Sequence, residues 1–339
     1  MSRTVAILGA SGLVGRTTLS ILEERAFPAD RVRLLASPRQ AGRTLTFRGA
    51  QVPVEPVTAE AFRGAEIALF AVKNAIAQQW APIAQEAGAC VIDYSSAYRY
   101  DDRVPLVVPE VNGSLLDARP TLVANPNCSA APIVIALKPL EALGRLQRLV
   151  VSTYQSVSGA GSAAIEDLEA GMRAAAGGAP PPRLADGRPA FALNCIPHID
   201  AFQEHGYTRE EMKVVWETRK ILGLPALPVS VTAVRVPVRI GHSAAVHATF
   251  DRAVDPAAAR QAWAAFPGLE VADDPQNSKY PMPLDAAGRD PVVVGRARTD
   301  LTDPHTLVFF VVSDNLRKGA ALNAVQIAER WLGAPAGVR

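Results

Sequence analysis

The feature that most constrains the fold is a glycine turn near the start of the chain, GASGLVG. It follows the apolar run TVAIL and precedes an amphipathic stretch at 16–25. Glycine lets a backbone turn sharply between a strand and a helix, and it lets a phosphate approach the helix N-terminus. The turn around Gly9, Gly12 and Gly15 therefore predicts a dinucleotide-binding unit. Because the spacing is Gly-x-x-Gly-x-x-Gly, a purely structural turn is the alternative.

Short apolar runs alternate with helical stretches in the first third of the chain, a pattern typical of a parallel, doubly wound sheet. Strands are expected at 4–10, 31–37, 67–72, 90–95 and 121–126, and helices at 16–25 and 74–88. The sequence thus predicts an α/β chain that begins with a Rossmann-type sheet.

The pattern changes after about residue 128 and predicts an α+β region with a mixed sheet and helices on one face. Helices are expected at 129–144, 209–223 and 316–332. Strands are expected within 148–161 and at 305–314, and a pair of strands is expected in 229–250 with a turn near Ile240 and Gly241. The Pro- and Gly-rich stretch 177–190 predicts a loop or lid. We expect the last helix to pack back on the first domain, so the domains are 1–127 with 315–339, and 128–314.

Composition excludes several classes of protein. The 339 residues carry a net charge of +2 without a long basic run, so no nucleic-acid or membrane surface is expected. No apolar run approaches the roughly 20 residues of a membrane span, and Val5 to Leu8 is too short for a signal peptide. Cys90, Cys128 and Cys195 are far apart, which indicates neither a disulfide framework nor a metal site. We therefore expect a cytoplasmic protein without a metal.

The end of the second predicted strand reads ASPRQAGR and contains no acidic residue. An Asp or Glu near this position would bind the ribose hydroxyl of NAD, whereas an arginine suits the 2′-phosphate of NADP. Ser37, Arg39 and Arg43 therefore favour NADP. The alternative is that these arginines are solvated surface residues.

Cys128 lies in NPNCSAAP, between a predicted strand and a predicted helix. A helix N-terminus favours the thiolate, which is the nucleophilic form of cysteine. The alternative is that Cys128 is a small buried hydrophobic residue. A nucleophile needs a partner, and His242, at a turn after VRVPV, is the candidate base. His247 is expected to be structural, Cys90 is expected to be core, and the remaining histidines lie in loops.

Seven motifs in order carry a resemblance to the aspartate-β-semialdehyde dehydrogenase family. They are GASGLVG, SSAYR, NPNCSAAP, YQSVSGAG, EEMKVVWETRKIL, VRVPV followed by GHS, and DNLRKGAALNA, and they span about residues 4 to 332. The resemblance implies reversible, NADPH-linked reduction of L-4-aspartyl phosphate to L-aspartate 4-semialdehyde and phosphate. It also implies that residues 128–314 form a catalytic and dimerisation domain in a homodimer.

The resemblance also implies a role for individual residues. Cys128 would carry the acyl thioester, His242 would be the acid/base partner, and Gln155 would orient the acyl group. Arg235 would hold the substrate α-carboxylate, and Glu210 the ammonium, although Glu211 is an equal candidate by composition. The implied phosphate pocket comprises Arg99, Asn127 and Lys213. The implied cofactor contacts are Gly9, Ser11, Gly12, Leu13, Val14, Gly15, Ser37, Arg39, Gln40, Ser158, Gly159 and Asn315.

Three other functions remain open at this point. An N-acetylglutamyl-phosphate reductase would share the glycine turn, the cysteine and the histidine, but its substrate has no free ammonium. A thiol hydrolase could use Cys128 and His242 with a purely structural glycine turn. A non-catalytic NADP-binding relative is disfavoured because Cys128, Gln155, Arg235 and His242 are all present.

Overall fold

The computed structural model describes residues 3–333, which form two compact units. The first unit comprises residues 3–127 and 320–333, and the second comprises 128–319. The chain therefore returns to the first unit at 319/320, where the sequence suggested 314/315. Residues 334–339, which were expected in the first domain, lie outside the described residues.

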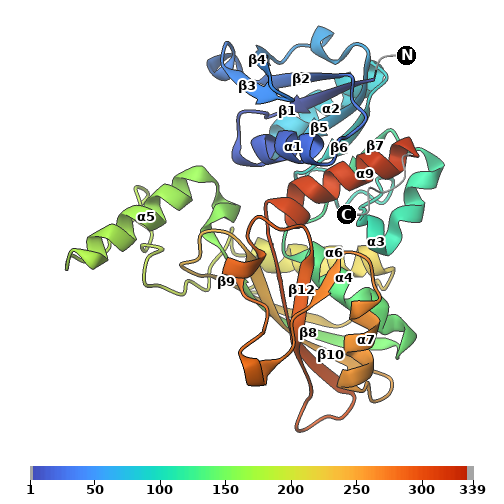
Figure 1. Cartoon of the computed structure of the whole chain (residues 1–339), viewed down its shortest axis with the longest axis vertical. Helices are drawn as coiled ribbons and strands as arrows, with labels where there is room; N and C mark the ends of the chain where they lie inside the picture. Colours follow the sequence, from blue (N-terminus) through green and yellow to red (C-terminus); the bar gives the residue numbers. More distant parts are fainter. Residues whose placement is uncertain (1–2, 334–339) are drawn as a thin grey trace. The chain divides into compact units, whose positions relative to one another are not determined.

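A seven-stranded sheet forms the centre of the first unit (Figure 1). Its strands, in spatial order, are β3 (Thr44–Phe47), β4 (Ala50–Pro56), β2 (Arg31–Ala36), β1 (Thr4–Leu8), β5 (Ala65–Phe70), β6 (Cys90–Asp93) and β7 (Leu122–Ala124). All neighbours are parallel except the β3–β4 hairpin at the edge. The predicted doubly wound sheet is confirmed, whereas the hairpin was not expected.

Helices cover both faces of this sheet. They are α1 (Leu13–Glu24), α2 (Asn74–Glu86), α3 (Pro109–Asn112) and α9 (Leu322–Leu332), with short 3₁₀ turns at Pro38–Gln40, Glu60–Phe62 and Gly113–Ala118. Alternate residues of β1 point to opposite faces. Val5 and Ile7 join a core with α1 and α9, whereas Ala6 and Leu8 join a core with α2.

The closing helix α9 packs against α1, although some 300 residues separate them (Figure 1). The predicted return of the C-terminal helix to the first domain is thus confirmed. A buried ion pair reinforces this contact: Arg25, which follows α1, donates two hydrogen bonds of 2.7 and 2.8 Å to the Glu329 carboxylate. The side chains of the pair are only 13% and 6% exposed.

The second unit is built on a six-stranded mixed sheet. Its strands, in spatial order, are β11 (Leu269–Val271), β12 (Val292–Thr299), β13 (Thr306–Ser313), β10 (His242–Phe250), β8 (Leu146–Gln155) and β9 (Val229–Arg235). β8 runs parallel to β9 and antiparallel to β10. The expected strand pair within 229–250 is present, while β11 and β12 were not expected.

Most of the longer helices of this unit pack on one face of its sheet, whereas the longest, Ser162–Ala176, packs against the 3₁₀ turn at Val157–Ala160 and projects away from the sheet in Figure 1. The helices are α4 (Ala130–Leu137), α5 (Ser162–Ala176), α6 (Arg209–Leu222), α7 (Pro256–Ala264) and α8 (Pro283–Ala286), with 3₁₀ turns at Lys138–Ala142, Val157–Ala160 and Pro275–Asn277 and a π-helical turn at Arg317–Ala321. α4 contacts α6, β12 and β13, and α7 contacts β11 and β12. The one-turn helix α8 packs on the opposite face through Ala286, beside Phe310. As predicted, 177–190 forms a loop, whereas α5 was not expected.

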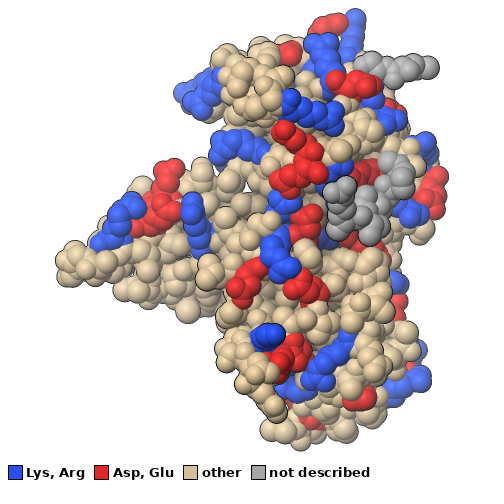
Figure 2. Space-filling model, in the orientation of Figure 1, with Lys and Arg blue, Asp and Glu red and all other residues tan. Residues whose placement is uncertain are grey.

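Charges of both signs are interspersed on the face drawn in Figure 2. Lys and Arg side chains alternate there with Asp and Glu over the surface of each unit. Within residues 3–333, no helix is both long enough and apolar enough to cross a membrane.

We expect Glu329→Ala to destabilise the first unit by about 3 kcal/mol, because it leaves the Arg25 charge buried without its carboxylate. Glu141→Ala is the matched control, since it breaks an exposed pair with Lys138 and should cost less than about 1 kcal/mol. Thermal melting of both variants checks this. Equal shifts in melting temperature would show that the buried pair contributes no more than a surface pair.

Candidate active site

Cys128 lies two residues before the start of α4 in the second unit. Every residue of α4 from Ala130 to Leu137 is buried, so the helix that Cys128 precedes is fixed in the core. Gly319 packs against Cys128, since a Cβ on Gly319 would lie 3.0 Å from the Cys128 Cβ. The thiol itself is only partly buried. Asn127, the preceding residue, is buried at the end of the first unit.

The parallel strands β8 and β9 end side by side, with Gln155 paired to Arg235. The Arg235 guanidinium is buried and donates a 2.7 Å hydrogen bond to the carbonyl oxygen of Ser156. Burial lowers the pKa of Arg235, while negative charge at Cys128 and Glu210 opposes this shift. The guanidinium is therefore within electrostatic range of the thiol and of Glu210.

His242 is the first residue of β10 and is 2% exposed. Its Nδ1 lies 3.1 Å from the backbone nitrogen of Ser156, which donates to it, and 3.0 Å from the Ser156 hydroxyl. Its Nε2 is buried without a hydrogen-bond partner among the described residues. Burial, followed by the positive charge of Arg235, moves the pKa of His242 well below its ordinary value. The imidazole is therefore neutral at pH 7.

Gly159 separates His242 from Arg235. A Cβ at this position would lie 3.1 Å from His242 Nε2 and 3.2 Å from Arg235 Nη1, so any side chain would press on both. The lack of a side chain lets both polar groups border the same small space.

Asn315 is held inside a buried network behind His242. Its Oδ1 accepts from Gly241 N at 2.9 Å and lies 3.0 Å from the hydroxyls of Ser156 and Ser158. Its Nδ2 donates to Ser158 at 2.9 Å. Ser158 and Asn315, which the sequence linked to the cofactor, are thus built into the support of the histidine.

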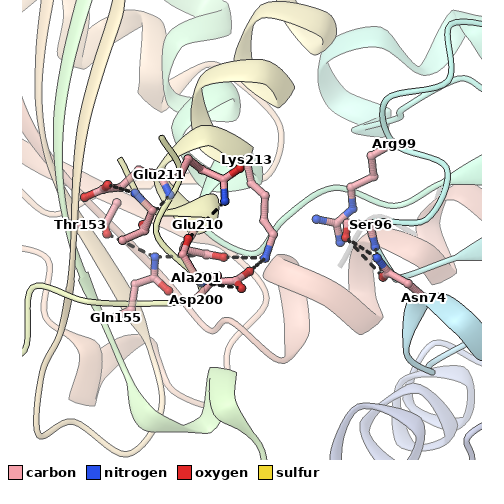
Figure 3. A network of polar contacts seen from close by, with 12 residues as sticks. Asn74, Ser96, Arg99, Thr153, Gln155, Asp200, Ala201, Glu210, Glu211 and Lys213 are labelled. Atoms are coloured by element: carbon pink, nitrogen blue, oxygen red, sulfur yellow. Dashed lines mark hydrogen bonds and ion pairs between the residues drawn. The ribbon is translucent and has the colours of Figure 1, made fainter. Parts of the chain in front are cut away.

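A chain of polar contacts joins Gln155, Glu210, Lys213 and Asp200 (Figure 3). Gln155 Nε2 donates to Glu210 Oε1 at 3.3 Å, and Lys213 Nζ lies 3.0 Å from Glu210 and 2.7 Å from Asp200. Burial alone would lower the pKa of Lys213, but Glu210 and Asp200 together raise it. Lys213 is therefore charged, and Glu210 is both buried and ion-paired.

Glu211 has a structural task at the start of α6. Its carboxylate accepts from the backbone nitrogens of Thr208 at 2.6 Å and Ala233 at 2.9 Å, and the Thr208 side chain accepts in return from Glu211 N. This is a capping box extended to β9. Since both oxygens of Glu211 are bonded to backbone, Glu210 is the better candidate for a substrate ammonium.

The glycine turn of the first unit has the geometry that a dinucleotide needs. Gly9 adopts φ +87°, and a Cβ there would lie 2.3 Å from the Ala71 carbonyl oxygen. A Cβ on Gly15 would lie 2.2 Å from the Gly9 oxygen. No side chain of the described residues caps α1, which starts at Leu13 after Gly12, and its first turn carries no acid. The helix N-terminus is therefore open to a phosphate.

The remaining predicted cofactor residues lie close to this turn in the sequence or at the end of β2. Ser11 and Val14 flank the start of α1, and the Ser11 carbonyl accepts from Arg16. Ser37 and Arg39 are exposed after β2, and Gln40 ends the 3₁₀ turn there. This set of residues fits a dinucleotide, because it offers backbone donors, a close approach and a cationic side chain without a competing carboxylate.

Arg99 is buried in the first unit and donates to the Tyr94 carbonyl at 2.6 Å. Nearby, Ser96 donates from its backbone nitrogen to Asn74, as Figure 3 shows. The neighbouring Asp101 is bonded to Arg103 at 2.6 Å.

Other residues considered from the sequence lie outside these clusters. Cys90 is buried in β6, where burial raises its thiol pKa to about 12, so its expected packing role is confirmed. His247 is about half exposed, 3.8 Å from Asp300. Among residues 3–333, no group of His, Cys, Asp or Glu side chains is arranged to hold a metal ion.

Two residues of the site were missed by sequence reasoning. Ser156 contacts both His242 and Arg235, mainly through its backbone, and a backbone contact has no sequence signature. Asp200 reaches Lys213 from a loop of irregular conformation, at φ +69°. Only the position of Ser156, directly after Gln155, could have indicated it.

Comparison with known proteins first defines the class. A family model described as "Semialdehyde dehydrogenase, NAD binding domain" matches residues 4–118, and one described as "Semialdehyde dehydrogenase, dimerisation domain" matches residues 137–318. The chain is thus a semialdehyde dehydrogenase by class, an oxidoreductase that uses a nicotinamide cofactor.

Similar proteins narrow this class. "Aspartate-semialdehyde dehydrogenase" of Aquifex aeolicus is 48% identical over 97% of this chain and 98% of its own length, and that of Bacillus subtilis is 44% identical over 96% of both. The crystal structure of aspartate semialdehyde dehydrogenase II complexed with ASA from Vibrio cholerae is 43% identical, with a TM-score of 0.94 over 98% of this chain and 99% of that one. The chain belongs to the aspartate-semialdehyde dehydrogenase family.

The two neighbouring glutamates give a matched pair of variants. We expect Glu211→Gln to lower the free energy of unfolding by about 1–3 kcal/mol, because an amide offers one acceptor oxygen to two buried N–H groups. Glu210→Gln should change the melting temperature less and raise KM for aspartate semialdehyde. Melting curves and steady-state kinetics on both variants test this. If Glu211→Gln raised KM at unchanged stability, the assignment of the two residues would be reversed.

Proposed function

We propose that the chain catalyses the reversible, NADPH-dependent reductive dephosphorylation of L-4-aspartyl phosphate to L-aspartate 4-semialdehyde and phosphate. This reaction belongs to the aspartate pathway to lysine and diaminopimelate, methionine and threonine. The observation that carries the proposal is the cluster in the second unit, where Arg235 and His242 border one space at Gly159 and Arg235 is within electrostatic range of Cys128.

Cys128 is the nucleophile in this proposal. Its thiolate attacks the acyl carbon, phosphate leaves, and an acyl thioester remains on the sulfur. A bound nicotinamide supplies the hydride that reduces this thioester. Cys128 lies two residues before the buried helix α4, and a helix N-terminus favours negative charge. Gln155, fixed at the end of β8, orients the acyl group.

The substrate backbone is held by charges of opposite sign. The Arg235 guanidinium can grip an α-carboxylate with paired hydrogen bonds. Glu210, buried beside Gln155, can accept from an α-ammonium. Arg99, Asn127 and Lys213 are the residues proposed to bind phosphate. Lys213 is charged but shared with Glu210 and Asp200, so an incoming phosphate would compete with those carboxylates.

The preferred cofactor is NADP in this proposal. Gly9, Gly12 and Gly15 would admit the pyrophosphate to the N-terminus of α1, and Arg39 would bind the 2′-phosphate. The exposed position of Arg39 directly after β2 and the absence of an acid from residues 37–43 support this choice. Ser158, Gly159 and Asn315 would lie at the nicotinamide end.

A free substrate ammonium distinguishes this function from that of an N-acetylglutamyl-phosphate reductase. The Glu210 carboxylate is buried, and an acylated nitrogen would give it one weak donor in place of a cation. A thiol hydrolase needs no dinucleotide, so that function would not explain the open glycine turn of the first unit. Neither alternative accounts for both units.

We also propose a cytoplasmic homodimer. The sheet face opposite α4 and α7 carries Tyr154, Ala245 and Phe310, with the Tyr154 and Phe310 rings 6.0 Å apart. Tyr154 is 38% exposed. An aromatic sheet face of this kind suits a self-complementary interface. Three thiols without a disulfide between them fit a reducing compartment.

The decisive test is phosphate-dependent formation of NADPH from aspartate semialdehyde. Wild-type protein should reduce NADP only when phosphate is present, because phosphate must release the acyl group from Cys128. Cys128→Ala should bind NADPH normally and lose turnover. Cys195→Ala, at an exposed cysteine, is the matched control and should retain turnover. Turnover by Cys128→Ala near the wild-type rate would refute the thioester mechanism.

Cofactor preference tests the role of Arg39. We expect Arg39→Ala to lower kcat/KM for NADP about 10- to 100-fold, because one charge-assisted contact to phosphate contributes about 1.5–3 kcal/mol. The value for NAD should change little. Arg43→Ala, at the next arginine along the chain, is the control. An unchanged NADP/NAD ratio in Arg39→Ala would remove Arg39 from the cofactor site.

A further inference from the structure

One segment of the second unit has no task in the reaction described above. It comprises α5 and the Pro- and Gly-rich loop 177–190 that follows it (Figure 1). α5 packs against the 3₁₀ turn that contains Gly159. Beyond the loop, Ile196 and Arg235 exchange two backbone hydrogen bonds, of 2.8 and 2.9 Å. The segment therefore leaves the candidate site beside Gly159 and returns to it at Arg235, the residue proposed to bind the α-carboxylate.

The returning chain is anchored on α5. Ala190 and Ala192 are 8% and 1% exposed. A Cβ on Gly171 of α5 would lie 2.8 Å from the Ala192 Cβ, so the chain passes directly against the helix there. The Asn194 side chain donates to the Ala190 carbonyl oxygen at 2.8 Å. The fixed part of the chain thus begins two residues after Arg188.

Arg188 lies at the end of a tight turn. Leu184 donates from its backbone nitrogen to the Arg188 carbonyl oxygen at 3.0 Å, and Gly187, at φ +82°, donates to the Leu184 carbonyl oxygen at 2.9 Å. The Asp186 carboxylate accepts from the Arg188 backbone nitrogen at 3.1 Å and from its Nε at 2.7 Å. The Arg188 side chain is nevertheless 63% exposed. Its charge is therefore paired within the turn but accessible to a second anion.

The charges of Arg188 and Arg235 act on each other. Burial is the main cause that lowers the pKa of Arg235, and the positive charge of Arg188 lowers it further. Two like charges within electrostatic range repel each other, and an anion that binds near both relieves this repulsion. A carboxylate at Arg235 would therefore also be attracted by Arg188.

We propose that Arg188 is a second cation of the substrate site, which attracts the α-carboxylate that Arg235 binds, and that Asp186 weakens this attraction by competing for the Arg188 guanidinium. The inference rests on the proposed function and gives the loop 177–190 a task in substrate binding. Because Arg188 is largely exposed, its contribution is that of a surface ion pair, and it affects binding more than the chemical step.

Steady-state kinetics of two variants test this with effects of opposite sign. We expect Arg188→Gln to raise KM for aspartate semialdehyde about 2- to 5-fold at low ionic strength, with little change in kcat. Asp186→Asn should lower KM, because asparagine keeps an oxygen for the Arg188 backbone N–H but loses the competing charge. Arg173→Gln, at an exposed arginine in the last turn of α5, is the matched control. An unchanged KM in Arg188→Gln, an equal rise in Arg173→Gln, or a KM that does not fall in Asp186→Asn would overturn the proposal.

Salt separates an electrostatic role of Arg188 from a structural one. Between about 0.02 M and about 0.5 M salt, screening should remove most of the difference in KM between wild type and Arg188→Gln. A difference that persists at high salt would show that the variant distorts the loop, and would contradict the proposal.

A measurement without turnover keeps this inference apart from the proposed function. In a Cys195→Ala background, Cys128 is alkylated with iodoacetate, which is anionic, and with iodoacetamide, which is neutral. Arg188→Gln should lower the ratio of the two rates, and Asp186→Asn should raise it. An equal ratio in the presence and absence of the Arg188 charge would overturn the proposal. Failure of wild type to reduce NADP would instead count against the proposed function, since alkylation requires neither cofactor nor substrate.

Discussion

The main chain of Ser156 holds the polar groups of the second unit in place. Its N–H binds His242 at the start of β10, and its carbonyl accepts from Arg235 at the end of β9. β8 lies between these two strands, so one residue at its end can reach both. A backbone amide cannot rotate away as a side chain can. The relative position of the histidine and the arginine is therefore as rigid as the sheet.

Burial of charge is the second constraint, because a buried carboxylate must be paired or hydrogen-bonded. Glu211 meets this requirement with backbone donors from Thr208 and Ala233, which ties α6 to β9. Glu210 meets it with side-chain donors, Gln155 and Lys213. Side-chain partners can rearrange around a ligand, whereas the backbone donors cannot. This difference between the two glutamates separates a binding residue from a structural one.

Much of the architecture could be predicted from sequence, because parallel strands and amphipathic helices leave a periodic pattern. The glycine turn, the positions of the first five predicted strands and the return of α9 all carried such a pattern. The β3–β4 hairpin and β11 did not, since short edge strands have little periodicity. At the site, residue types identified Cys128 and His242 as candidates, and the family resemblance added Arg235. Sequence could not separate Glu210 from Glu211, because only the neighbouring backbone donors distinguish them.

Two glycines, Gly159 and Gly319, leave space at the site that any side chain would fill. Gly319 touches Cys128, and Gly159 touches both His242 and Arg235, at distances where any Cβ would crowd its neighbours. Crowding at either position would shift a reacting group by some tenths of an ångström, and misplacement of about 1 Å can cost roughly 100-fold in rate. Neither glycine needs a positive φ, so neither is required by its own backbone. The space that the thiol, the imidazole and the guanidinium require therefore explains why these two positions are glycine.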